Sequence, residues 1–212
     1  MTVKERYERI LKEIESYNPT IIAVTKYYGI EKMIEAYEAG LRNFAESRAI
    51  EAQEKINNID DTVKSQSIYH FIGHLQTNKV KYVVGNFEYI HSVDSLKIAK
   101  CIDEEASKKG IKQKILIQVN NASETQKFGI APCQIENLIN EVSMMNSLEL
   151  VGLMNIAPLT DDIKELQRLF TQMKNLKDEY NLKELSMGMS QDYKIALDCG
   201  ATMIRLGRIL FN

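Results

Sequence analysis

The strongest constraint on the fold is a repeated order of short apolar segments, turns and amphipathic segments. Segments with the length and β-branched content of strands occur at residues 21–24, 42–45, 68–72, 87–91, 114–119, 148–154, 182–186 and 202–205. No Asn-Gly hairpin turn joins any two of them. The connections are therefore helical, which predicts right-handed βαβ units and a parallel sheet.

Helical spacing of apolar residues predicts one helix before the first strand and one between each pair of consecutive strands. These helices are expected at residues 2–17, 30–39, 46–57, 76–84, 94–108, 132–144, 161–180 and 191–199. Asp94 is the expected N-cap of the helix over 94–108. Little of the chain follows the last strand, which leaves little room for a helix after it. We therefore expect the helix over 2–17 to occupy part of that helix's place in the ring of helices around the strands.

Eight βα units favour a closed α/β barrel, a (β/α)8 TIM barrel, with an open doubly wound sheet as the structural alternative. The chain has 212 residues, three Pro and ten Gly, and no linker-like run interrupts the pattern. We therefore expect one domain over residues 1–212. In such barrels, functional side chains gather at the C-terminal ends of the strands.

Composition removes several classes of function. The net charge is -2 and no basic tail is present, which disfavours nucleic-acid binding. No apolar run has membrane or signal-peptide character, so we expect a cytoplasmic protein with no membrane association. Three widely spaced cysteines suggest neither disulfides nor a zinc site. His70 and His74 are separated by Gly73 and are not expected to share a helix face, so no metal site is predicted.

Lys26 follows the first apolar strand, where the chain is expected to break into a turn at Gly29. This position places its amine at the mouth of the predicted barrel. Our hypothesis is that the amine holds pyridoxal phosphate (PLP) as an imine, a Schiff base. A solvated surface lysine is the alternative that position alone favours.

Two segments near the C-terminus suggest a phosphate site. Residues 185–190 read Leu-Ser-Met-Gly-Met-Ser, and a glycine turn with the Ser190 hydroxyl suits a phosphate. The alternative is that Ser190 caps the following helix. Arg205 leaves the last strand two residues before Gly207, and barrels often bind phosphate with the loops after strands seven and eight. Arg208 either contacts the phosphate or extends to solvent.

Seven motifs carry a family resemblance, and together they span most of the chain. They lie at residues 23–26, 44–48, 69–79, 127–129, 152–158, 185–190 and 205–207. In these motifs the chain resembles the YggS/PROSC family of PLP homeostasis proteins. The resemblance implies a monomeric barrel like the N-terminal domain of alanine racemase.

The resemblance also implies roles for individual residues. Lys26 is the imine lysine, and Arg205 faces the pyridine nitrogen. The phosphate is held by Ser190 and the backbone near Met189, together with Gly207 and Arg208. Ser47 stands where the family has a cofactor-binding asparagine, and Arg208 stands where it has a small hydroxyl residue.

The function implied is PLP homeostasis, with transfer of the cofactor to apoenzymes that require it. No catalytic residue is assigned. One alternative is a PLP-dependent amino-acid racemase of weak activity, for which Tyr69 or a loop supplies an acid opposite the lysine. Another is an aldolase that forms a lysine imine with a phosphosugar.

Overall fold

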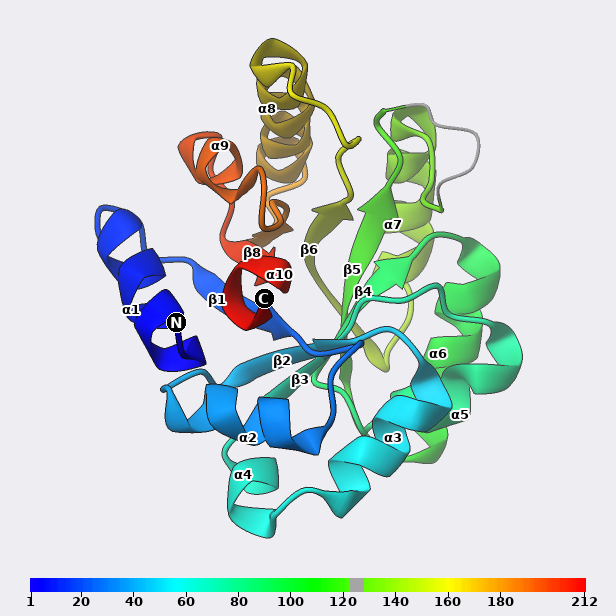
Figure 1. Ribbon diagram of the computed structural model, residues 1–212. Coiled ribbons are helices and arrows are strands. Elements are labelled where there is room, and N and C mark those ends of the chain that lie inside the picture. The colour runs from blue at the N-terminus through cyan, green and yellow to red at the C-terminus, as the bar shows by residue number, and fades with distance from the viewer. Residues whose placement is uncertain (123–127) are drawn as a thin grey trace.

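The strands close into a barrel in which every neighbouring pair is parallel (Figure 1). The computed structural model describes residues 1–122 and 128–212. The strands are β1 Thr20–Val24, β2 Asn43–Glu46, β3 Ile68–Phe71, β4 Tyr89–Val93, β5 Gln113–Val119, β6 Leu148–Asn155, β7 Glu184–Ser186 and β8 Met203–Leu206. They follow chain order around the ring, and β8 pairs with β1. The prediction of a (β/α)8 barrel is confirmed, and the open-sheet alternative is wrong.

Helices surround the barrel and connect successive strands (Figure 1). They are α1 Val3–Glu13, α2 Ile30–Glu38, α3 Ala49–Asn58, α4 Asp61–Ser65, α5 Val80–Val83, α6 Leu96–Lys108, α7 Ile135–Ser143, α8 Ile163–Glu179, α9 Tyr193–Asp198 and α10 Arg208–Phe211, with 3₁₀ turns at Thr77–Lys79 and Pro132–Gln134. None of the helices in the described ranges is long and apolar enough to cross a membrane.

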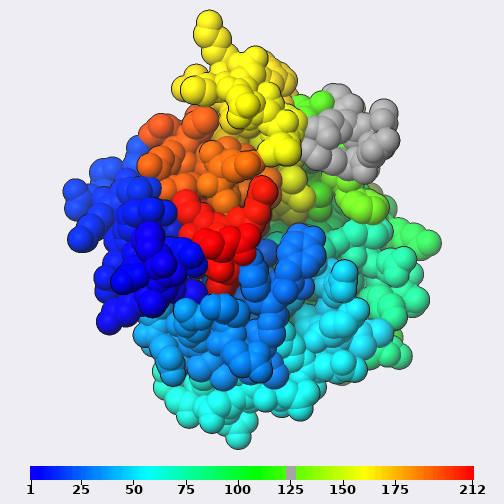
Figure 2. Space-filling model, viewed as in Figure 1, coloured from blue at the N-terminus to red at the C-terminus, as the bar shows by residue number. Residues whose placement is uncertain are grey.

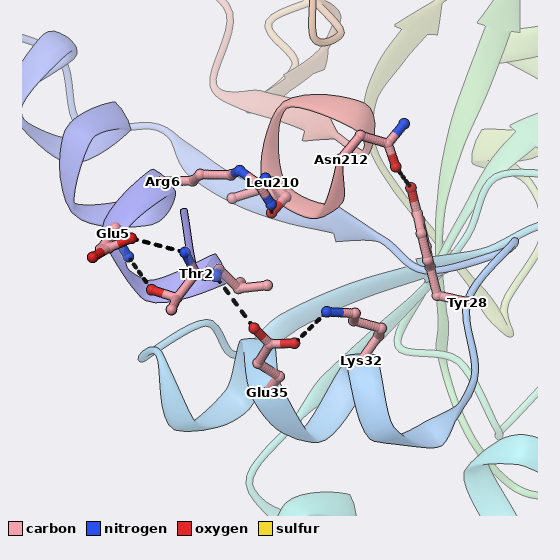
Figure 3. Close-up of polar contacts among 9 residues, drawn as sticks. Thr2, Glu5, Arg6, Tyr28, Lys32, Glu35, Leu210 and Asn212 are labelled. Atoms are coloured by element: carbon pink, nitrogen blue, oxygen red, sulfur yellow. Dashed lines mark hydrogen bonds and ion pairs between the residues drawn. The ribbon is translucent and has the colours of Figure 1, made fainter.

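The first helix occupies the gap in the ring between α9 and α2, as expected from the sequence. A capping box starts it, in which Thr2 Oγ1 accepts from Glu5 N–H and Glu5 accepts from Thr2 N–H. Val3 N–H donates to Glu35 of α2 over 3.3 Å (Figure 3). On the other side, the Tyr193 hydroxyl of α9 donates to Glu13 over 2.6 Å.

The last helix was not expected and lies close to the first. Arg6 of α1 donates to the carbonyl of Leu210 in α10 over 3.2 Å (Figure 3). Figure 2 shows the red C-terminal residues between the blue N-terminal segments and the orange segment of α9. Both ends of the described chain therefore contribute to the same side of the barrel.

Two apolar layers stabilise the barrel, because its strands are buried on both faces. The larger layer lies between strands and helices and includes Phe44, Phe71 and Ile115. The smaller layer fills the barrel interior, where its buried members are Ile22, Ala45, Leu116, Val151, Met154 and Met203. Burying each Leu, Ile or Val side chain contributes about 1.5–3 kcal/mol.

Several predicted boundaries are wrong by a few residues. Glu46 belongs to β2 rather than to the following helix. Strand β4 covers Tyr89–Val93, two residues later than predicted, and the cap of α6 is Ser95 instead of Asp94. Helix α4 was not predicted. Of the loop predicted at residues 120–130, residues 123–127 lie outside the described part of the chain.

Candidate functional site

Lys26 lies in the loop between β1 and α2, immediately beyond the C-terminal end of β1. The side chain is partly exposed, and its Nζ is 5.0 Å from the centroid of the Tyr27 ring. Within residues 1–122 and 128–212, this Nζ forms no hydrogen bond or ion pair. The amine is therefore held only loosely at the barrel mouth.

Backbone donors from the segment after β8 converge on Ser190, which follows β7. The amides of Gly207 and Ile209 both donate to Ser190 Oγ, each over 3.3 Å. The alternative that Ser190 caps the next helix is wrong, because α9 begins at Tyr193 after the N-cap Asp192. Ser190 and Gly207 are therefore in direct contact, and their predicted role in holding a phosphate stays a prediction.

Asp192 is a buried carboxylate in the same loop that the sequence did not single out. It accepts a hydrogen bond from Met189 N–H over 2.5 Å. Burial raises the pKa of the Asp192 carboxyl, while that hydrogen bond and the charge of Arg205 act in the opposite direction. For Met189 N–H to donate to a phosphate, it must therefore first release Asp192.

Gly188 sets the path of the loop after β7. Its φ is +89°, in the left-handed region that favours glycine, and an added Cβ would lie 2.6 Å from the Cβ of Ala196. Gly188 O accepts from Arg205 N–H over 3.0 Å, which joins this loop to β8. The close approach explains a glycine at this position.

Arg205 is a buried cation near the C-terminal end of β8, with 4% of its surface exposed. Its guanidinium donates to Ser186 Oγ over 2.6 Å and to the carbonyl of Asn155 over 2.7 Å. Burial lowers the pKa of Arg205 to about 10, opposed by the charge of Asp192, so the group stays charged at neutral pH. Arg205 is thus a fixed positive donor.

A chain of buried polar groups continues from Arg205 across the barrel interior. Ser186 Oγ lies 3.0 Å from His91 Nδ1, and His91 Nε2 lies 2.9 Å from His70 Nδ1. His70 Nε2 lies 3.0 Å from Asn43 Oδ1. Arginine can only donate, so the Ser186 hydroxyl accepts from Arg205 and donates to His91 Nδ1. An amide oxygen can only accept, so His70 donates to Asn43 through Nε2. We therefore assign the proton of each histidine to Nε2.

His70 and His91, the two histidines of this polar chain, are uncharged at neutral pH. Burial lowers the pKa of His70 to about 3. It also lowers the pKa of His91 well below 6.5, and the positive charge of Arg205 acts in the same direction. His70 and His91 are thus buried, hydrogen-bonded residues of the barrel interior. Their connection to Arg205 through Ser186 was not predicted.

The remaining predicted site residues differ in their surroundings. Ser47 is partly buried after β2, next to Gly73, where an added Cβ would lie 2.0 Å from the Ser47 carbonyl oxygen. Arg208 is exposed at the start of α10. The predicted residues thus come from the ends of four adjacent strands, β7, β8, β1 and β2. The structure brings Ser190 and Gly207 into contact, and places Arg208 next to them on the surface.

His74 lies in the loop after β3, and Phe128 lies in the segment that follows β5. Their rings stack with centroids 3.8 Å apart, and His74 Nδ1 is 3.6 Å from Asp94 Oδ2. His70 bonds inside the barrel instead, so the two histidines do not form a metal-binding pair. Of the 127–129 motif, Lys127 lies outside the described residues.

Tyr69 cannot supply an acid opposite Lys26, so that part of the racemase alternative is wrong. The residue lies in the outer apolar layer with its ring 6.4 Å from that of Phe44. It also lines a cavity of about 450 Å³ formed by segments that precede β3, β4 and β5, including Ser67, Gly85 and Lys112. That cavity is at the N-terminal end of the barrel, whereas Lys26 is at the C-terminal end.

A polar atom at the C-terminal end of β6 is buried without a hydrogen-bond partner among the described residues. This atom is Oδ1 of Asn155, whose backbone carbonyl accepts from Arg205. Its Nδ2 donates to Asn121 over 3.1 Å. An unpaired buried acceptor beside a fixed cation and two converging amides is the donor and acceptor set expected around a polar, phosphorylated ligand.

Comparison with known proteins places the chain in a family. The family model for the alanine racemase N-terminal domain matches residues 2–212. A PLP homeostasis protein of Synechocystis is 42% identical over 199 residues, which cover 91% of this chain and 90% of the relative. The chain belongs to the PLP homeostasis protein family.

Solved members of this family have the same fold. PipY of Synechococcus elongatus, solved without PLP, is 34% identical with a TM-score of 0.91, covering 99% of this chain and all of PipY. PipY with PLP bound is 33% identical with a TM-score of 0.86 and the same coverage. The resemblance inferred from the motifs is therefore confirmed at the level of family and fold.

Proposed function

We propose that this chain is a PLP-binding protein of intracellular PLP homeostasis and holds the cofactor through Lys26. The observation that carries the proposal is the position of Lys26 Nζ, free of hydrogen bonds in the described structure, at the mouth of a barrel whose relative PipY has been solved with PLP bound. The proposal treats residues 1–212 as one PLP-binding domain. We further propose that the protein is monomeric and cytoplasmic, and that it passes PLP to apoenzymes.

The donors after β7 and β8 suit the phosphate of PLP. Gly207 N–H and Ile209 N–H already point at one oxygen, that of Ser190, so a phosphate oxygen placed beside that hydroxyl meets converging donors. Arg208, exposed next to Gly207, adds positive charge at the same edge. Met189 and Ser47 complete the proposed cofactor contacts.

Arg205 suits the pyridine nitrogen of PLP. When bound, PLP supplies an aldehyde that reacts with amines and a ring that accepts electron density. A permanently charged arginine donates a hydrogen bond but accepts none, so it disfavours a protonated ring nitrogen opposite it. Arg205 thereby favours storage of PLP over chemistry that needs a strong electron sink.

The experiment replaces Lys26 with Ala and measures the visible absorption band of the protein with PLP. The expected result is loss of the band, with the free energy of unfolding within about 0.5 kcal/mol of the original because the side chain packs against little. Lys12→Ala, on the exposed face of α1, is the control and should keep the band. A Lys26→Ala protein that retains the band would remove Lys26 from the proposed site.

A further inference from the structure

A buried ion pair packs against the loop that carries Lys26. Glu46 is the last residue of β2, and Lys55 lies in α3. Their charged atoms are 2.6 Å apart, and their side chains are 5% and 11% exposed. Burying two charges costs several kcal/mol per ion unless each is paired and hydrogen-bonded. The pair is therefore stable only because its other hydrogen bonds are made.

Lys55 uses all three of its N–H donors. One goes to Glu46 Oε1, and the others go to the carbonyl oxygens of Thr25 at 2.9 Å and Tyr28 at 2.8 Å. The Thr25 hydroxyl donates to the same Glu46 oxygen over 2.7 Å. One buried cation thus binds the backbone on both sides of the Lys26-Tyr27 dipeptide.

Backbone hydrogen bonds complete this arrangement. Thr25 N–H donates to Ala45 O over 3.0 Å, which fixes the start of the loop to β2. Tyr28 N–H donates to Thr25 O over 2.9 Å, which closes the turn around Lys26. The loop backbone is therefore fixed, whereas Lys26 Nζ forms no hydrogen bond in the described structure.

We propose that Glu46 and Lys55 are positioning residues, which fix the Lys26 loop so that its amine faces the aldehyde of PLP. The inference rests on the proposed function. With PLP bound, the unprotonated Lys26 amine would form a double bond from its nitrogen to the aldehyde carbon, and the carbonyl oxygen would leave as water with the two amine hydrogens. Such attack requires the two atoms about 3–3.5 Å apart and aligned. Neither Glu46 nor Lys55 takes part in the bond change.

The expected size of the effect follows from backbone entropy. Fixing the backbone of one residue has an entropic cost that corresponds to roughly a tenfold change in an equilibrium constant. Without the Lys55 cation, the loop becomes ordered only when PLP binds, so the entropic cost reduces the affinity for PLP. Loss of the pair should therefore weaken PLP binding about tenfold.

The test compares Lys55→Met with the double variant Glu46→Gln/Lys55→Met. Lys55→Met leaves the Glu46 charge buried and should lower the Tm strongly, whereas the double variant should regain most of the Tm because no unpaired charge remains. In both variants, Met at position 55 cannot donate to the carbonyl oxygens of Thr25 and Tyr28. Both should therefore bind PLP about tenfold more weakly by visible titration, and in both the Tyr28 amide should exchange hydrogen faster without PLP.

Leu148→Ala is the control for destabilisation alone. Leu148 is buried at the start of β6, at the end of the barrel opposite Lys26. This variant should lower the Tm while keeping the PLP affinity and the protection of the Tyr28 amide. Thr25→Val, which removes one hydroxyl and leaves the ion pair in place, is expected to weaken PLP binding about threefold and serves if the double variant does not fold.

A double variant with the original PLP affinity and the original Tyr28 exchange rate would overturn the positioning role. If only Thr25→Val folds, unchanged affinity and exchange in that variant would overturn the positioning role of Glu46, which bonds the loop through the Thr25 hydroxyl. Failure of the proposed function is a separate result, since the unmodified protein would then show no visible band with PLP. The exchange rate of the Tyr28 amide would still report on the loop in that case.

Discussion

Lys26 and Arg205 are basic residues from neighbouring strands that are held in opposite ways. Arg205 donates to Ser186 and to Asn155, and it is almost fully buried. Lys26 Nζ makes no hydrogen bond within the described ranges. A group that forms a covalent bond must be free to reach its partner, whereas a group that orients a ring must stay fixed. The two surroundings match the two proposed roles.

The position of Lys26 was predictable because it depends on local sequence, a strand followed by a turn. The partners of Arg205 were not, because Asn155 is 50 residues away and the two meet only when the barrel closes. The Glu46–Lys55 pair was missed for a related reason. Glu46 was assigned to a helix, whereas in the structure it ends β2 and faces α3.

Gly188 gives a prediction at the residue scale. Gly188→Ala should lower the free energy of unfolding by about 2–4 kcal/mol, since it combines a left-handed φ with a Cβ 2.6 Å from another Cβ. Gly110→Ala is the matched control, because its φ is +64° but nothing lies within 4 Å of the added Cβ. That variant should lose only about 1 kcal/mol. Equal losses in urea unfolding would show that the close packing at Gly188 has no effect.

At the scale of elements, the barrel interior combines an apolar cluster with one polar chain. Strands β2, β3, β4, β7 and β8 each contribute one member of the chain from Asn43 to Arg205. A hydrogen-bonded chain of this kind is tolerated in a core because each member is paired. The short apolar segments predicted that the sheet is buried. They did not predict which of their residues point into the barrel together.

The neutral histidines make stability depend on pH. Both have a folded pKa below their unfolded value, which is near 6.5, so only the unfolded chain gains their protons as the pH falls. Stability is therefore constant above that value and decreases below it. Between pH 7 and pH 5 each histidine should remove about 2 kcal/mol from the free energy of unfolding.

Urea unfolding at the two pH values measures this decrease. His91→Gln keeps a hydrogen-bonding side chain but does not titrate, so its decrease should be about half that of the original protein. Comparing decreases instead of absolute stabilities removes the cost of the substitution itself. An equal decrease in both proteins would contradict the assignment of His91 as a neutral buried group.

At the scale of the whole molecule, the two ends of the described chain complete the barrel around the proposed site. Helix α1 lies between α9 and α2, and α10 contacts both α1 and the loop after Lys26 (Figures 1 and 3). In that loop, the Tyr28 hydroxyl donates to Asn212 over 2.7 Å, and its ring is 4.6 Å from that of Phe211. The earliest strand and the latest segment thus share one surface.

The barrel was predictable because eight strand-like segments with helical connections permit few other arrangements. The short helix α10 was not, since four residues carry too little periodicity to be recognised. It matters because it brings Gly207 and Ile209 amides to Ser190. The sequence therefore indicated that Ser190 and Gly207 lie at the same end of the barrel, but not the hydrogen bonds that join them.

The most direct measurement is to reduce the protein with borohydride in the presence of PLP and locate the modified residue by mass spectrometry. Reduction makes the bond between the lysine nitrogen and the cofactor permanent, so the attachment point is read from the peptide that gains mass. The expected result is modification of the peptide that contains Lys26, at Lys26 itself. Modification of another lysine, with Lys26 unmodified, would contradict the proposed site.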